Sequence, residues 1–169
     1  MKTETEKKSE LQIVVDAAQL FEKEITQENQ EELINKYVEL IDPNGTGSPF
    51  GAPNKDQETV IYEGSEMTWS ITTLKPDEKD IDGVGNYLSF LESMVQEVNP
   101  EESKGFFKEG LKIDVNGKNQ IVGHVLTDDS VKDGDHERYI LRFHITKGDL
   151  FKDSMTIDPK LLIKKKPNI

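Results

Sequence analysis

Apolar and polar residues alternate along much of the chain, and this pattern predicts β-strands. Near the N-terminus, Leu11, Ile13 and Val15 occupy every second position. The same alternation, or a short apolar run of strand length, marks further candidate strands at residues 59–62, 67–73, 111–115, 120–126, 138–145 and 154–163. Every second side chain of a half-buried strand faces the core, so each segment has one apolar face to bury.

Turn-forming residues separate these segments. The pair Asn116-Gly117 is the strongest hairpin signal in the chain. Residues 42–57 are rich in Gly, Pro, Asn and Asp, and they predict a loop long enough to be functional or mobile. Pro159 has no backbone N–H, so it predicts a sheet edge or a bulge for the residues that follow it.

Two segments fit more than one structure. Residues 33–41 place apolar side chains on one face of a helix, but residues 37–41 also suit a short buried strand. We favour a short helix, or none, followed by a strand near 37–41. Residues 86–95 suit either a strand or a short helix.

Many short strands, polar turns and little helix predict a mainly β protein. We expect an antiparallel two-sheet β-sandwich, Ig-like or jelly-roll-like, with at most one or two short helices. A chain of 169 residues suits one domain. We expect a flexible polar leader at residues 1–10, a single sandwich domain at 11–163 and a basic tail at 164–169.

Charge and composition exclude several kinds of partner. A formal net charge of −12 disfavours nucleic acid and anionic lipid, because both would be repelled. No apolar run approaches the about 20 residues that span a bilayer, and the charged N-terminus lacks the apolar core of a secretory signal. We therefore expect a cytoplasmic protein with no nucleic-acid partner and no membrane insertion. Export by a specialised machine and release by lysis stay open.

The acidic and imidazole side chains form no complete metal site. Residues 77–92 resemble a calcium loop, but neither register supplies both the early oxygen ligands and the late glutamate of an EF-hand. Asp80 and Asp82 are weak candidates for another kind of calcium site. His124 and His144 lie in separate predicted strands that a sheet could bring together. A zinc site there is weaker than the alternative of imidazoles at the surface, and a copper site would need a cysteine, which the chain lacks. We expect no cofactor.

No catalytic constellation is complete. Residues 127–139 combine acids with Ser130 and His136, but no G-x-S-x-G nucleophile motif is present. Phosphate-binding and H-E-x-x-H motifs are also absent. Pairs of carboxylates are inevitable among 33 acidic residues and give no support by themselves. We expect a protein that is not an enzyme and has no catalytic residues.

Trp69 is the only tryptophan in the chain. It shares its predicted strand face with Met67 and Ile71, whereas a ligand-stacking tryptophan usually lies on a polar face or a loop. We therefore expect Trp69 to pack between the sheets. The expected structural core also contains the following residues: Met67, Ile71, Tyr139, Leu141 and Phe143.

Several short motifs resemble a known family. A strand ending at Asp16 is followed by an irregular region, then by Gly64 and Trp69 in a Gly-x-x-x-x-Trp strand, and finally by Asp158-Pro159. In this order they resemble the AidA/PixA inclusion-body proteins of bacteria. The resemblance implies a β-sandwich of similar length that accumulates in the cytoplasm. Ile157 stands where that family has an aromatic residue, and no catalytic residues are implied.

Three hypotheses about function follow. The first is a non-catalytic protein that self-associates as a homo-oligomer through edge strands near residues 11–15 or 154–163. The second is a module that binds a glycan or another small ligand through loop 42–57 with Tyr62 and Tyr87, or with the Asp80 and Asp82 carboxylates. The third is a component or effector of a secretion or contractile assembly, with a protein partner.

Overall fold

The computed structural model describes residues 9–43, 47–74, 87–97, 112–113, 120–125, 133–134 and 136–164. Several sequence-based expectations lie outside these residues: most of the polar leader and of the basic tail, the acidic candidates Asp80 and Asp82, the Asn116-Gly117 hairpin turn, and Ser130. The expected boundaries at residues 10 and 164 fall inside strands, because the first strand begins at Ser9 and the last ends at Lys164.

The described residues form ten strands, two α-helices and one 3₁₀ helix. In chain order they are β1 (Ser9–Val15), α1 (Ala17–Phe21), α2 (Gln30–Tyr37), β2 (Val38–Ile41), η1 (Asn54–Asp56), β3 (Glu58–Tyr62), β4 (Glu66–Thr73), β5 (Tyr87–Glu97), β6 (Lys112–Ile113), β7 (Gln120–His124), β8 (His136–Lys147), β9 (Leu150–Ile157) and β10 (Lys160–Lys164). The segment 30–41 is therefore a short helix followed directly by a strand, and residues 87–97 are a strand.

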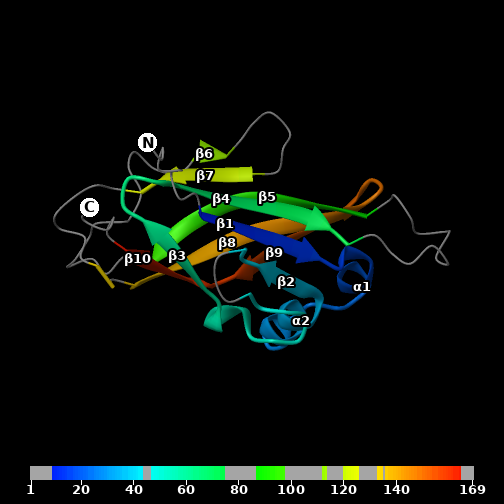
Figure 1. The fold of residues 1–169 in the computed structure, drawn as a ribbon. Coiled ribbons are helices and arrows are strands. Elements are labelled where there is room, and N and C mark those ends of the chain that lie inside the picture. Colours follow the sequence, from blue (N-terminus) through cyan, green and yellow to red (C-terminus); the bar gives the residue numbers. More distant parts are fainter. Residues whose placement is uncertain are drawn as a thin grey trace.

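The strands form two sheets that lie one over the other (Figure 1). Sheet A has the order β2-β1-β4-β7-β6. Sheet B has the order β3-β10-β8-β5, and β9 also pairs with β8. This arrangement confirms the predicted mainly β, two-sheet sandwich with short helices.

Two strand pairs run parallel, which the antiparallel expectation did not include. Strand β1 pairs with β4 in parallel, and β3 pairs with β10 in parallel. Both pairs join segments far apart in the chain, since the chain crosses between the sheets from β2 to β3 and back to β4. Side chains alternate with period two in both kinds of pair, so alternation does not reveal strand direction.

The core lies between the sheets and is built from the alternating apolar positions. Leu11 and Ile13 of β1 lie beside Met67 and Trp69 of the neighbouring strand β4, with Leu11 paired to Trp69, and all four side chains are fully buried. From sheet B, the core receives Tyr139, Leu141 and Phe143, also fully buried, while Ile71 of sheet A is almost so. The residues expected to form the structural core are thus all found there.

Polar contacts also join the two sheets. The Trp69 indole N–H donates a hydrogen bond to the Tyr139 hydroxyl at 2.9 Å. Near one end of β1, the Ser9 hydroxyl donates to the Val60 carbonyl at 2.7 Å. At the far end of β4, the Thr73 hydroxyl donates to Ser89 at 2.9 Å. These contacts satisfy polar groups that would otherwise lose water at the sheet interface.

Of the segments proposed as exposed edges, residues 11–15 and 160–163 are not edges, whereas residues 154–157 belong to β9, which pairs only with β8 among the described strands. Strand β1 lies between β2 and β4, and β10 lies between β3 and β8. Pro159 does not end a sheet. It joins β9 to β10, which pair with successive parts of β8, and its carbonyl accepts a hydrogen bond from the Tyr139 N–H at 3.4 Å.

Helix α1 lies at one end of the sandwich, and α2 lies along its side next to β2 (Figure 1). Helix α1 contacts β5 and β8, and α2 contacts β2 and β9. Leu20 of α1 and Ile34 of α2 are buried in the core. No helix in the described part of the chain is long and apolar enough to cross a membrane.

Candidate functional site

An exposed apolar surface lies on the outer face of sheet B. Leu88, Phe90, His144 and Phe151 form it, and we call it the outer surface. Residue pairs across the strands place them on one face, because Phe90 pairs with His144 while Leu88 and Phe151 both pair with Thr146. Their neighbours Leu91, Phe143 and Ile145 turn inward and are buried. Leu88 and Phe151 are 52% and 57% exposed. Exposing large apolar side chains to water is unfavourable, so a cluster of them on one surface is unusual.

The imidazole of His144 organises this surface. Its ring stacks on Phe90 at a centroid distance of 5.0 Å, and its centroid lies 4.4 Å from that of Phe151, with the two ring planes tilted by 37°. Its Nδ1 lies 2.8 Å from a carboxylate oxygen of Glu92. The two rings and this carboxylate fix the orientation of the imidazole, so the surface is ordered rather than loosely packed.

A polar network lies at the same end of sheet B. Glu22, just after α1, accepts hydrogen bonds from Lys147 at 2.7 Å and from the Tyr87 hydroxyl at 3.0 Å. The Lys147 hydrogen bond lowers the pKa of Glu22 and the Glu22 carboxylate raises the pKa of Lys147. The Tyr87 ring also packs edge-on against Phe21. The contacts of Tyr87 with Glu22 and Phe21 therefore stabilise the packing of α1 against sheet B.

The two tyrosines expected to bind ligand do not lie together. Tyr87 pairs with Lys147 at the end of β8, whereas Tyr62 pairs with Lys164 beyond the first residues of β8. They therefore occupy opposite ends of sheet B. Their role in ligand binding stays a prediction.

The histidines are also apart. His124 ends β7 in sheet A and is exposed, whereas His144 lies on the outer face of sheet B. The expectation that one sheet could bring them together was therefore wrong. His136 instead lies 3.1 Å from Glu58 on β3. Among the described residues, no group of three or more His, Cys, Asp or Glu side chains is placed to hold a metal ion.

Loop 42–57 folds back on the molecule where it is described. Backbone hydrogen bonds of 2.8 Å in both directions join Leu40 and Ser48. Gly51 donates to the Asn35 carbonyl at 2.8 Å, and the Asn54 N–H donates to the Asn35 side-chain oxygen at 3.0 Å. Helix α2 thus fixes the second half of this loop.

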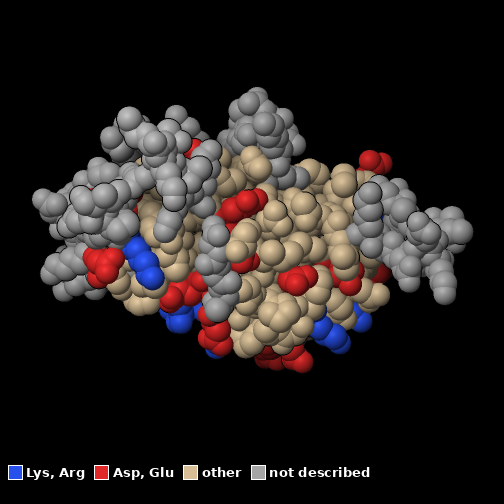
Figure 2. Space-filling view, viewed as in Figure 1, with Lys and Arg blue, Asp and Glu red and all other residues tan. Residues whose placement is uncertain are grey.

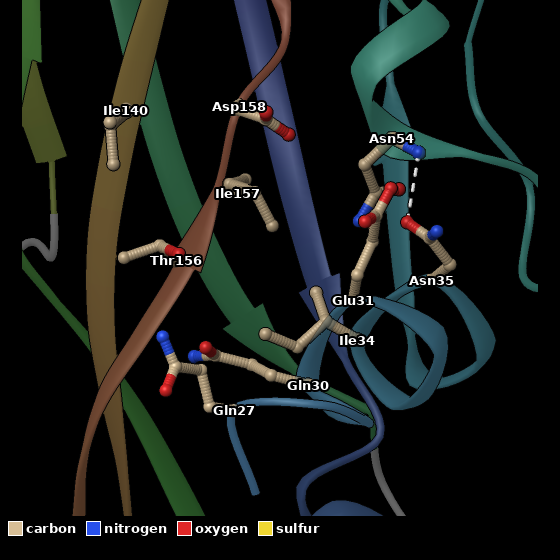
Figure 3. Close-up of a pocket in the computed structure, with 10 residues that line it drawn as sticks. All are labelled: Gln27, Gln30, Glu31, Ile34, Asn35, Asn54, Ile140, Thr156, Ile157 and Asp158. Carbon is tan, nitrogen blue, oxygen red and sulfur yellow. Dashed lines mark hydrogen bonds between the residues drawn. The ribbon is translucent and has the colours of Figure 1, made fainter.

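A polar pocket of about 200 Å³ lies between α2 and β9 (Figure 3). We call it the β9–α2 pocket. It is lined by Gln27, Gln30, Glu31, Ile34, Asn35, Asn54, Ile140, Thr156, Ile157 and Asp158. Sequence reasoning missed it, because the lining comes from four separate segments. The only signal was the concentration of carboxamides at residues 27–35 beside a loop rich in Asn.

The surface near α2 is acidic. Figure 2 shows acidic side chains gathered over α2 at the lower edge of the view, while much of the other described surface on this face is uncharged. Glu28, Glu31 and Glu32 line a shallow hollow there together with Lys36. Anionic ligands approaching this end would be repelled.

The motif residues that carry the family resemblance have structural roles. The Asp16 carboxylate caps α1 by accepting from the Gln19 N–H at 3.4 Å. Gly64 adopts a φ of 74° in the turn between β3 and β4. Trp69 lies in the core, and Asp158-Pro159 joins β9 to β10. These residues therefore have structural roles within the sandwich.

The fold and these surfaces define a two-sheet β-sandwich with short helices and with parallel as well as antiparallel pairs. The chain is similar to the crystal structure of the inclusion body protein PixA from Burkholderia cenocepacia, with a TM-score of 0.54 and 12% sequence identity. The match covers 98% of this chain and 100% of that chain. No family model matches the sequence, and no curated protein matches it. The resemblance to PixA inferred from the short motifs is confirmed at the level of the fold.

Proposed function

We propose that this chain is a non-catalytic cytoplasmic protein that associates with copies of itself through the outer surface. The observation that carries the proposal is the exposure of Leu88 and Phe151 beside the ordered His144 ring. The sandwich fold shared with an inclusion body protein supports it further.

The distribution of charge favours contact with a second copy of the chain at the outer surface. With a net charge of −12, two copies repel each other over most of their surfaces. On the outer surface the rings of Phe90 and Phe151 enclose a histidine, and the Glu92 carboxylate is already engaged by it. Contact there buries apolar area while bringing few like charges together.

The outer surface consists of four side chains, whereas a standard stable interface contains about 20–30 residues on each partner. The expected association is therefore weak and grows with protein concentration, as suits a protein that accumulates. The homo-oligomer would form in concentrated solution and dissociate on dilution.

Light scattering over a concentration series tests the proposal. The average mass of the wild type should rise toward millimolar concentration, and Phe151→Ser should abolish most of this rise. Phe50→Ser is the matched control, because Phe50 is an exposed phenylalanine, 38% accessible, in a turn away from the outer surface. A strictly monomeric wild type, or equal losses in both variants, would remove the proposal.

A further inference from the structure

We propose that the β9–α2 pocket binds a small neutral polyhydroxylated molecule, either a single sugar ring or a short polyol. This inference is independent of self-association, since the pocket and the outer surface share no residues. It uses Asn54 of loop 42–57, which the sequence suggested for ligand binding, but none of the tyrosines or of the aspartates Asp80 and Asp82 suggested with that loop.

Asn54 provides the first reason. Its side chain lines the pocket and the residue is only 2% exposed, yet its Nδ2 has no hydrogen-bond partner. A buried donor without a partner is unfavourable, because it has lost its hydrogen bonds to water. The other groups of the residue are engaged, since its N–H donates to Asn35 and its Oδ1 accepts from the Ser48 hydroxyl at 3.3 Å. Asn54 is thus held in place with one donor left for a ligand.

The remaining polar lining sets the chemistry of that ligand. The carboxamides of Gln27 and Gln30 extend toward Thr156 on β9 (Figure 3). The exposed Gln27 side chain can both donate and accept hydrogen bonds, whereas the Glu31 carboxylate, which also pairs with Lys55 at 3.6 Å, can only accept. A hydroxyl group can donate to a carboxylate and accept from Asn54. An ammonium group cannot accept, and an anion would be repelled.

The size and the apolar lining of the β9–α2 pocket further restrict the ligands that it can bind. Ile34, Ile140 and Ile157 supply apolar surface against which the C–H groups of a sugar ring or polyol can pack. The volume of about 200 Å³ is smaller than the about 300–1,000 Å³ of pockets for drug-sized ligands. It therefore suits one ring or a short chain, and a longer glycan would enter only by its terminal residue.

Amide chemical shifts of the full-length protein, titrated with glucose, galactose, mannose and glycerol, test the inference. At least one of these probes should shift the amides of residues 27–35 and 156–158. Gln27→Ala should weaken that binding about tenfold without changing the melting temperature, because Gln27 is exposed. Gln19→Ala, an exposed glutamine on α1, is the matched control and should bind like the wild type.

A glycan array separates the two sources of such a ligand. Binding of free monosaccharides indicates a metabolite, and binding only to array glycans indicates a terminal sugar of a larger molecule; both support the site. Absence of shifts with every probe together with a silent array would overturn it. Shifts caused by ethanolamine but by no polyol, or equal weakening in Gln27→Ala and Gln19→Ala, would also overturn it.

Discussion

Trp69 and Tyr139 join the two sheets of this protein by an edge-to-face ring contact and by a hydrogen bond. Their ring centroids are 5.5 Å apart at an interplanar angle of 62°, and the indole N–H donates to the phenol oxygen at 2.9 Å. Both side chains are fully buried. Trp69 on β4 therefore forms a contact between the two sheets at the centre of the core and does not offer its ring to a ligand.

Substitutions of Trp69 and of Tyr139 should both destabilise the fold, but by different amounts. Trp69→Ala should lower the free energy of unfolding by about 3–5 kcal/mol, since it empties a large volume in the core. Tyr139→Phe keeps the ring and leaves the indole N–H without this acceptor, at a cost of about 1–3 kcal/mol. Urea unfolding measures both. Equal stability of Tyr139→Phe and wild type would show that the hydrogen bond contributes nothing.

Burial also makes the stability sensitive to alkaline pH. Desolvation raises the pKa of Tyr139 in the folded state well above its ordinary value. The unfolded chain therefore releases this proton first, at about pH 10, and unfolding becomes easier as the pH rises further. The wild type should lose about 1.4 kcal/mol per pH unit more than Tyr139→Phe in this range. Parallel losses in the two proteins would contradict the predicted shift.

The sequence predicted the core well because alternation fixes which side chains turn inward. Trp69 and Tyr139 were both expected in the core, but nothing in their spacing indicated that they would meet. Parallel pairing of β1 with β4 was missed, since direction leaves no trace in a period of two. The expected edges at β1 and β10 were wrong, whereas β9, the other strand within residues 154–163, pairs only with β8 among the described strands.

The candidate sites were harder to predict than the core. The outer surface combines β5, β8 and β9, and its exposed Phe151 lies before the strand that the sequence predicted at residues 154–163. The β9–α2 pocket is built by polar residues from helix, loop and strand, and polar residues without periodicity resemble ordinary surface. Only the position of Asn54 next to α2 distinguishes the β9–α2 pocket from ordinary surface.

The turn at Gly64 should tolerate substitutions in a definite order. A φ of 74° is strained for residues with a Cβ, so Gly64→Ala should cost about 1–2 kcal/mol. Gly64→Asn should cost less, because asparagine adopts this conformation more readily, and Gly64→Val should cost most. Thermal unfolding of the three variants gives the order. Equal melting temperatures for Asn and Val would contradict the assigned strain.

The pKa of the Glu22 carboxyl group should report on the contact between α1 and sheet B. Lys147 is the main cause of the lowered pKa of Glu22. Lys147→Met should therefore raise the titration midpoint of the Glu22 carboxyl, measured by carbon NMR. Lys55→Met is the control, since Lys55 pairs with Glu31 instead, at 3.6 Å. An unchanged midpoint in Lys147→Met would mean that the network does not persist in solution.

Concentration-dependent amide shifts test the central claim, self-association through the outer surface, most directly. Between dilute and concentrated samples, the largest shifts should fall at residues 88–90, 144–146 and 151. Shifts confined to β2 or β3, the described outer strands at one side of each sheet, or no shifts at any concentration, would contradict it.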